Sequence, residues 1–152
     1  MTHEAITSSE LDPPTRVKTP FAHITAWDRL CAVAAIAALV AAILPWTVHN
    51  GASVRGIQGD GQFSMLCAVV GLVTLALHRN LDPLPLVRRL TLAAQSATAA
   101  LVLFVGAVNL TLLSTAAAIG VYLTLLAGLV WLVGAALGWR TPAPTPLEEQ
   151  WL

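Results

Sequence analysis

Long apolar runs separated by short polar stretches define the pattern of this chain. One run covers residues 30–46, and a second covers residues 63–78. A third covers residues 90–139, which include no Asp, Glu, Lys, Arg or His. As one helix, this run would extend about 75 Å, more than twice the roughly 30 Å core of a bilayer. The third run must therefore fold back on itself.

The third run has one polar cluster, formed by Asn109, Thr111, Ser114 and Thr115. A turn there divides the run into two segments of spanning length. An open sheet is not an alternative, because its unpaired backbone groups would face hydrocarbon. The pattern predicts an all-α protein, a bundle of four transmembrane helices at about residues 27–46, 63–78, 90–113 and 116–139.

Polar segments flank the predicted membrane domain of residues 27–139. Residues 1–26 contain charged side chains and three prolines (Pro13, Pro14 and Pro20), so they predict a disordered tail. Their length and acidic residues favour a retained first helix over a cleaved signal peptide. Residues 140–152 predict a second tail, whose proline-rich, acidic and apolar sequence is also compatible with a docking peptide.

Composition supports a membrane protein. Hydrophobic residues make up 57% of the chain and charged residues 11%, against roughly 45–50% and about 25% in soluble domains. The eight basic and eight acidic residues cancel, so no net field attracts nucleic acid, which we do not expect as a partner. The bilayer itself is the first expected partner.

The distribution of basic residues predicts the orientation of the bundle. Arg55 is the one basic residue on the side of the glycine-rich loop 47–62, whereas seven lie on the other side: Arg16, Lys18, Arg29, Arg79, Arg88, Arg89 and Arg140. Cytoplasmic segments carry such an excess. Both termini are therefore predicted to be cytoplasmic. Trp27, Trp46 and Trp139 fall at predicted helix ends, where indole rings prefer the headgroup level, whereas Trp131 lies deeper and is predicted to be a packing residue.

Small residues at regular spacing suggest where the helices touch. The fourth predicted helix carries Gly120, Thr124, Gly128, Gly134 and Gly138. Such residues allow close backbone approach in lipid. We interpret them as candidate helix-packing residues within the bundle, and a surface for a second copy or a partner helix is the alternative.

No catalytic, cofactor or metal site is predicted. Cys31 and Cys67 fall near opposite faces of the bilayer, and the four histidines are scattered. Intramembrane ionisable groups, the usual markers of ion or substrate pathways, are missing from the predicted helix cores. Four-helix small multidrug exporters have a similar size, but that family depends on a glutamate in its first helix, where this chain is apolar. Hydrolase and nucleotide-binding motifs are absent too, so we do not expect an enzyme.

Polar residues near the outer face form the one candidate interaction site. Arg55 and Asp60 lie close together among glycines, near the predicted level of Asn109. This cluster could bind an ion or a partner. Alternatively, Asp60 caps the second helix or pairs with Arg55. The uncharged polar residues of the third and fourth helices (Gln95, Ser96, Thr98, Asn109 and Thr124) are expected to bond neighbouring helices, with a neutral pathway as the alternative.

A short combination of motifs is shared with one group of proteins. Leu44 to Trp46 read LPW, and a glycine-rich loop, GDG at Gly59 to Gly61 and an apolar run follow. This arrangement resembles small four-helix integral membrane proteins of actinobacteria, including mycobacteria, over residues 27–139. The resemblance implies a bacterial cytoplasmic membrane and carries over no active residue.

Two hypotheses for function follow. The first is a non-enzymatic accessory or scaffold subunit, which acts through helix packing and tail contacts in a larger membrane complex. The expected protein partner is such a complex, with self-association as the alternative. The second is a small oligomeric carrier or channel for a neutral or lipidic solute, built around Gln95, Asn109 and Thr124.

Overall fold

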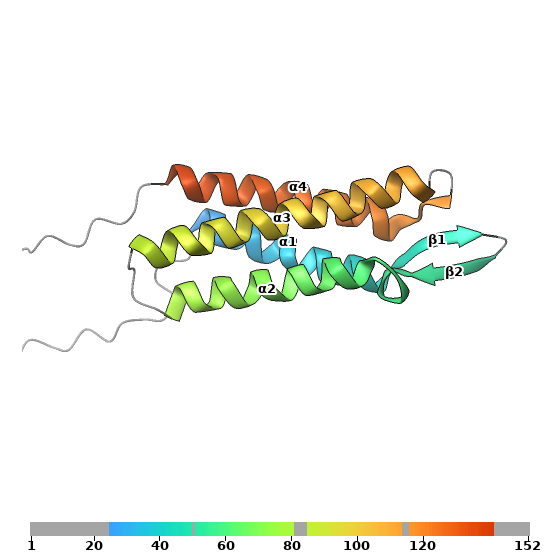
Figure 1. The fold of residues 1–152 in the computed structure, drawn as a ribbon, viewed down its shortest axis with the longest axis horizontal. Coiled ribbons are helices and arrows are strands. Elements are labelled where there is room, and N and C mark those ends of the chain that lie inside the picture. The colour runs from blue at the N-terminus through green and yellow to red at the C-terminus, as the bar shows by residue number, and fades with distance from the viewer. Residues whose placement is uncertain (1–24, 50, 81–84, 114–115, 142–152) are drawn as a thin grey trace, which may run out of the picture.

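The computed structural model describes residues 25–49, 51–80, 85–113 and 116–141 (Figure 1). The two predicted tails fall mostly on residues 1–24 and 142–152, outside the described ranges. In chain order, the elements are α1 (Ala26–Ile43), β1 (Pro45–His49), β2 (Ala52–Arg55), the 3₁₀ helix η1 (Gly56–Gln58), α2 (Gly61–Asn80), α3 (Pro85–Leu113) and α4 (Ile119–Arg140).

All four described α-helices are long and apolar enough to cross a membrane, which confirms that part of the sequence prediction. They contain 18, 20, 29 and 22 residues. At about 1.5 Å per residue, even α1 extends about 27 Å, close to the thickness of a hydrocarbon core. This is the architecture that a multi-pass membrane protein requires.

Two prolines shift the helix ends from their predicted positions. The first helix ends at Ile43 rather than Trp46, because Leu44 precedes Pro45 and takes an extended conformation, φ −70° and ψ 160°. The third helix begins at Pro85 rather than Leu90. Proline is well suited to the first position of a helix, where its missing N–H would have no intrahelical partner.

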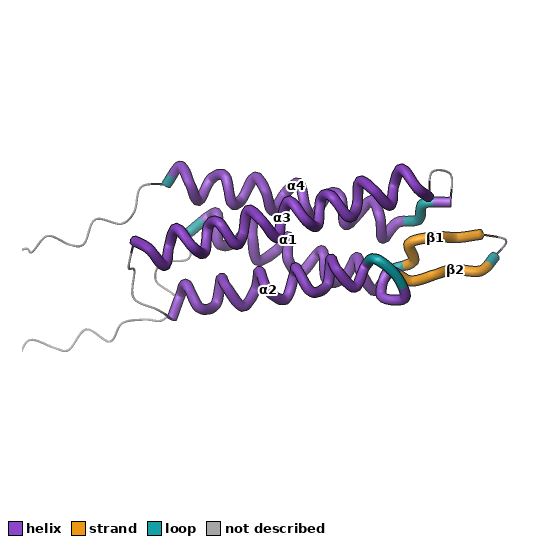
Figure 2. Tube along the Cα trace, viewed as in Figure 1, coloured by secondary structure: helices purple, strands orange, loops and turns teal. Residues whose placement is uncertain are grey.

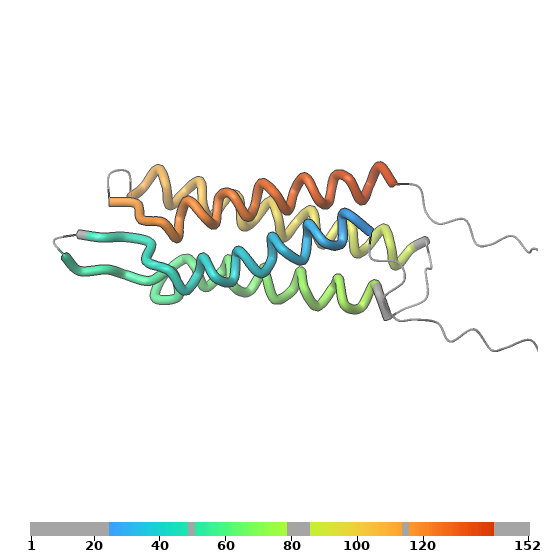
Figure 3. The backbone as a smooth tube through the Cα atoms, turned by 180° about the vertical axis from the view of Figure 1, so that it is seen from behind, coloured from blue at the N-terminus to red at the C-terminus, as the bar shows by residue number. Residues whose placement is uncertain are grey.

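The helices form an up-and-down bundle in which each packs against the next in sequence and α4 returns to α1 (Figures 1 and 3). We call the end where α1 begins and α4 ends the terminal end. The opposite end, where β1 and β2 extend beyond α1 and α2, is called the hairpin end (Figure 2).

The β1–β2 hairpin was not predicted, since the sequence indicated only a loop over residues 47–62. The strands are antiparallel, with Val48 opposite Ser53, and Gly51 turns the chain with a φ of 81°. An Asn-Gly pair, as at positions 50 and 51, with a valine two or three residues away on each side is a recognised hairpin signal that could have indicated this element.

Small side chains on α1 bring the helices close together around one large aromatic residue. Ala34, Ala35 and Ala38 of α1 are buried, and Trp131 of α4 is fully buried and belongs to the same cluster. The indole of Trp131 reaches Gly71 on α2, where there is no side chain in its way. Trp131 is thus a packing residue, as predicted.

Two of the three tryptophans expected at the headgroup level are instead inside the bundle. Trp27 lies in the first turn of α1 and Trp46 in β1, just beyond the other end of that helix, but each is only 4% exposed. The ring of Trp46 packs against Gly56 and Gly120, and its Nε1 donates to the carbonyl oxygen of Ala41 at 2.9 Å. Trp139 alone of the three presents a large part of its ring to the outside.

Candidate functional site

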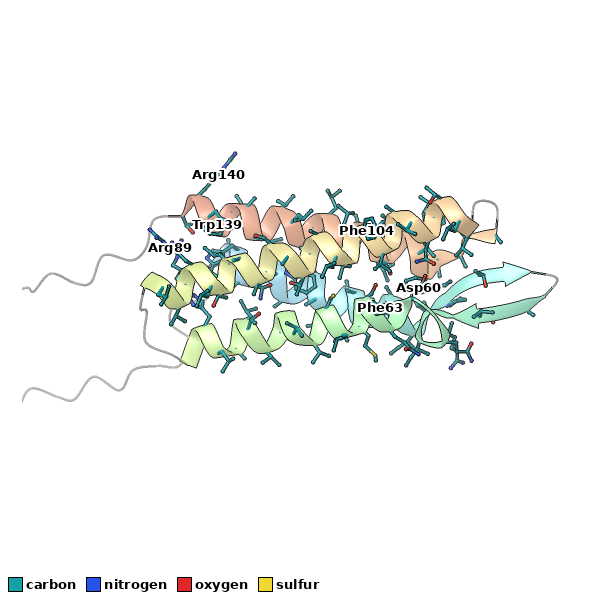
Figure 4. All side chains as sticks on the ribbon, in the orientation of Figure 1. Asp60, Phe63, Arg89, Phe104, Trp139 and Arg140 are labelled. Atoms are coloured by element: carbon teal, nitrogen blue, oxygen red, sulfur yellow. The ribbon has the colours of Figure 1, made fainter. Side chains whose placement is uncertain are left out.

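The hairpin end brings together the three predicted polar residues, Arg55, Asp60 and Asn109. They line one hollow, although β2, the turn before α2 and the last part of α3 supply them separately. The remaining lining residues are Trp46, Thr47, Val54, Gly56, Gly59 and Leu113. In Figure 4, Asp60 lies where the hairpin meets the bundle.

Hydrogen bonds connect this hollow to α3. The Nδ2 of Asn109 donates to Oδ2 of Asp60 at 3.2 Å and to the carbonyl oxygen of Val105 at 2.9 Å. Asp60 lies just before the first residue of α2. Among the described residues, its carboxylate bonds Asn109 and makes no ion pair with Arg55. The predicted pairing of Asp60 with Arg55 is therefore replaced by a link to α3.

The backbone holds the hairpin against the bundle on two sides. The N–H of Ala118 donates to the carbonyl oxygen of Trp46 at 2.8 Å, which ties β1 to the start of α4. The N–H of Gly56 donates to the carbonyl oxygen of Leu44 at 3.1 Å. Trp46 fills the space beside Gly56, where a side chain would not fit. The hollow is therefore formed by fixed elements.

The size of the hollow limits what it could hold. Its volume is about 180 Å³, below the roughly 300–1,000 Å³ of typical small-molecule sites. Water molecules or a single small ion would fit. One carboxylate, already engaged with an amide, is a sparse ligand set for a metal, and no group of three His, Cys, Asp or Glu side chains occurs within the described ranges.

A second polar cluster lies in the middle of the bundle and links three helices. Gln95 of α3 donates from Nε2 to the carbonyl oxygen of Gly71 at 2.7 Å and to Oγ1 of Thr74 at 2.9 Å, both on α2. Its Oε1 accepts from Nε1 of Trp131 on α4 at 2.6 Å. Both amide hydrogens of Gln95 are thus used. This agrees with the expectation that it bonds neighbouring helices.

The hydroxyl groups of the other predicted polar residues donate their hydrogen bonds within their own helices. Ser96 bonds the carbonyl oxygen of Leu92 on its own helix and accepts from Trp139 of α4. Thr98 and Thr124 donate to backbone carbonyl oxygens of their own helices. The five polar residues therefore do not converge on one site, and Asn109 lies apart from Gln95 at the hairpin end.

The predicted packing residues of α4 are all buried, and each glycine faces other parts of the same chain. Gly120 contacts Trp46, Gly128 contacts the backbone of Leu103 at α3, and Gly134 contacts Cys31 of α1. Gly138 lies against Leu92 and Trp27, and Thr124 bonds Gly120. These residues serve contacts within the bundle and are not available to a second copy.

The terminal end contains a buried carboxylate that the sequence did not indicate. The first helix begins at Ala26, so Asp28 lies in its first turn and is 6% exposed. Its Oδ2 accepts from the N–H and hydroxyl of Thr25, which forms a capping box. The expectation of a wholly apolar first helix is therefore wrong at this end.

Also at the terminal end, Trp27 of α1 packs against the ring of His78 on α2.

Two arginines adjacent in sequence have different environments at this end. Arg88 reaches from α3 to the end of α4 and donates to the carbonyl oxygens of Gly138, at 2.7 Å, and of Thr141. These carbonyls are among those that a helix end leaves without intrahelical partners. Arg89 is exposed. Arg88 therefore acts as a cap for α4.

No protein-family model matches the chain, and the comparisons found no significantly similar curated protein or solved structure. Its function is therefore inferred from its own residues and their contacts.

Proposed function

We propose that the chain is a non-enzymatic accessory or scaffold subunit of a larger protein complex in a bacterial cytoplasmic membrane. The observation that carries this proposal is the exposure of apolar side chains on a hairpin that is fixed to the bundle. Val48 and Val54, which the strand register places on opposite faces of the hairpin, are 50% and 47% exposed, and Ile57 in the following η1 is 39% exposed. Exposed apolar residues on a fixed extramembrane element are typical of docking surfaces.

The hairpin is held in a fixed position and has an open strand edge, as a docking surface requires. An isolated two-stranded hairpin is marginally stable in water, but this one is held by the backbone bonds of Trp46 and Gly56. In addition to its pairing with β2, β1 forms a bridge at Thr47 with Ala117. Among the described residues, β2 has β1 as its only strand partner, so its outer edge is open for an extended segment of a partner.

The proposed orientation of the bundle in the membrane follows from the distribution of its basic residues. With seven basic residues on the side of the termini and Arg55 alone at the hairpin end, the positive-inside rule places the termini in the cytoplasm and the hairpin outside. The partner then contributes an extracytoplasmic segment to the hairpin. The tail contacts of the proposed subunit are then made on the cytoplasmic side.

The interior supports an accessory subunit over a carrier. The Gln95 amide, the most polar group at the centre of the bundle, donates both hydrogens within the bundle and accepts from Trp131. A solute passing Gln95 would have to break these bonds and move a fully buried indole. Function at the outer surface requires neither change.

The first experiment is extraction of the tagged protein from its native membrane in a mild detergent, followed by mass spectrometry of proteins recovered in stoichiometric amount. We expect a defined larger complex. Recovery of the protein alone, or only with itself, would contradict the accessory function and make flux through liposomes the next assay.

Two variants test whether the partner contacts the hairpin or the helices. Replacing Val48 and Val54 by Thr keeps β-branched residues in the strands but makes both exposed side chains polar, and we expect the partner to be lost. Val33→Thr, on the exposed face of α1, is the matched control and should retain it. Loss of the partner with Val33→Thr alone would place the interface among the helices and refute docking at the hairpin.

A further inference from the structure

Three exposed residues lie at the terminal end of the bundle, where α3 begins and α4 ends. Arg89 belongs to the second turn of α3, and Trp139 and Arg140 are the last two residues of α4. Figure 4 shows their side chains at the terminal end of this helix pair. We call these three residues the basic corner.

The arginines of the basic corner have no partner among the described residues. Of the chain's acidic side chains, only Asp28 and Asp60 lie in the described ranges. Asp28 is buried in its capping box, and Asp60 is at the opposite end of the bundle. The carbonyl oxygens of Gly138 and Thr141 accept from Arg88. Within the part of the chain that the structure describes, nothing therefore neutralises the guanidinium groups of Arg89 and Arg140.

Trp139 sets the depth of this site in a bilayer. It is 51% exposed, unlike the buried Trp27 and Trp46, and its Nε1 donates to Oγ of Ser96 on α3 at 3.2 Å. This bond holds the indole between the two helices. Exposed tryptophans of membrane proteins favour the headgroup region, where their apolar ring and polar edge are both accommodated. The two arginines thus lie at the level of lipid phosphates.

We propose that the basic corner binds the headgroup of an anionic phospholipid. The two side chains point in different directions (Figure 4), so the planar guanidinium group of one arginine donates to phosphate oxygens and the other adds positive charge at the same end of the bundle. The ring of Trp139 packs beside the glycerol and upper acyl region. Ala93 of α3 and Ala136 of α4, each three residues along its helix from Ser96 or Trp139, are exposed small residues that leave room for an acyl chain.

The occupant is a lipid because these residues end two helices that are long and apolar enough to span a membrane. An anionic lipid is favoured over a zwitterionic one because two positive charges, with no acidic neighbour among the described residues, attract net negative charge. A basic residue at a membrane surface contributes roughly fivefold to the affinity for anionic lipid. The preference should weaken as salt is raised.

The test uses the full-length protein in vesicles of phosphatidylcholine. Brominated phosphatidylglycerol or brominated phosphatidylcholine is added at equal mole fractions, and quenching of tryptophan fluorescence is recorded. The contribution of Trp139 is obtained by subtracting the signal of a Trp139→Phe variant. We expect phosphatidylglycerol to quench this contribution several-fold more effectively, and we expect Arg89→Gln and Arg140→Gln each to lower the preference up to about fivefold.

Arg29→Gln is the matched control, because Arg29 is an exposed arginine at the same end of the bundle, on α1. It should leave the preference of Trp139 unchanged. Equal quenching by the two lipids would overturn the proposal. So would a preference that survives both substitutions in the basic corner, or one that Arg29→Gln lowers equally, since that would reflect general surface charge. Circular dichroism of each variant verifies that the helices are retained.

Discussion

Gly71 is the position where the smallest substitution should have the largest effect. It lies on α2 opposite the indole of Trp131, and a Cβ added there would overlap Cζ2 and Cη2 of that ring. The indole is fully buried, so it cannot move into open space. In Gly71→Ala, Trp131 must shift, and its bond to Oε1 of Gln95, 2.6 Å long, is the first to be lost.

The expected cost can be estimated from its parts. Overpacking a close-packed interior costs about 1–3 kcal/mol. Loss of a bond to a buried amide oxygen adds about 1 kcal/mol. Alanine is a better helix former than glycine by about 1 kcal/mol, which offsets part of this cost. We therefore expect Gly71→Ala to lower the free energy of unfolding by about 1–3 kcal/mol.

The assay is reversible unfolding in mixed micelles, with SDS added to the protein in a mild detergent and helix content followed by circular dichroism. The same substitution is then made in a Trp131→Phe background, where the smaller ring leaves room for the new methyl group. The cost of Gly71→Ala should fall there by at least half. A neutral effect in the parent, or an equal cost in both backgrounds, would refute the proposed contact.

Three further substitutions test other parts of the bundle. Gly128→Ala places a Cβ 2.8 Å from the backbone nitrogen of Leu103, so α3 and α4 must separate, and we expect a loss of about 1–3 kcal/mol in the same unfolding assay. Arg88→Gln removes the charged cap from the end of α4 and should lower stability by about 1–3 kcal/mol, with faster amide hydrogen exchange confined to the last turn of that helix. Asn109→Leu removes the bond to Asp60 and should speed hydrogen exchange at the start of α2, while the centre of the bundle keeps its protection.

The four helices could be predicted because lipid imposes a simple condition on sequence. A segment of spanning length without charges has few other stable conformations. The helix ends were less predictable, because hydrophobicity alone does not show that the residue before Pro45 leaves the helix or that Pro85 begins one. Backbone rules for proline would have corrected both boundaries.

The polar contacts could be predicted only in part. The sequence placed Arg55, Asp60 and Asn109 at one level, and they do line one hollow. It could not show that Gln95 bonds Trp131, because these residues lie 36 positions apart and their meeting depends on the rotation of α3 and α4 about their axes. The rotation is set by packing of all four helices together.

The burial of two tryptophans near the ends of α1 was also not predicted. Trp27 and Trp46 have the positions of interfacial anchors, yet both are inside the bundle. Glycines on distant segments make this possible, since Gly138 accommodates Trp27, and Gly120 accommodates Trp46. Sequence alone does not show which aromatic residue meets which glycine.

The central claim is that four helices span the membrane with the hairpin end outside and the terminal end inside. Labelling with a membrane-impermeant maleimide tests it most directly, after both native cysteines, Cys31 and Cys67, are replaced by alanine. Single cysteines are then introduced at two exposed positions, Ser53→Cys in β2 and Leu86→Cys near the start of α3. In right-side-out membrane vesicles, we predict labelling of Ser53→Cys alone, and in inverted vesicles labelling of Leu86→Cys alone. Labelling of both positions from one side, or the reverse pattern, would contradict the account.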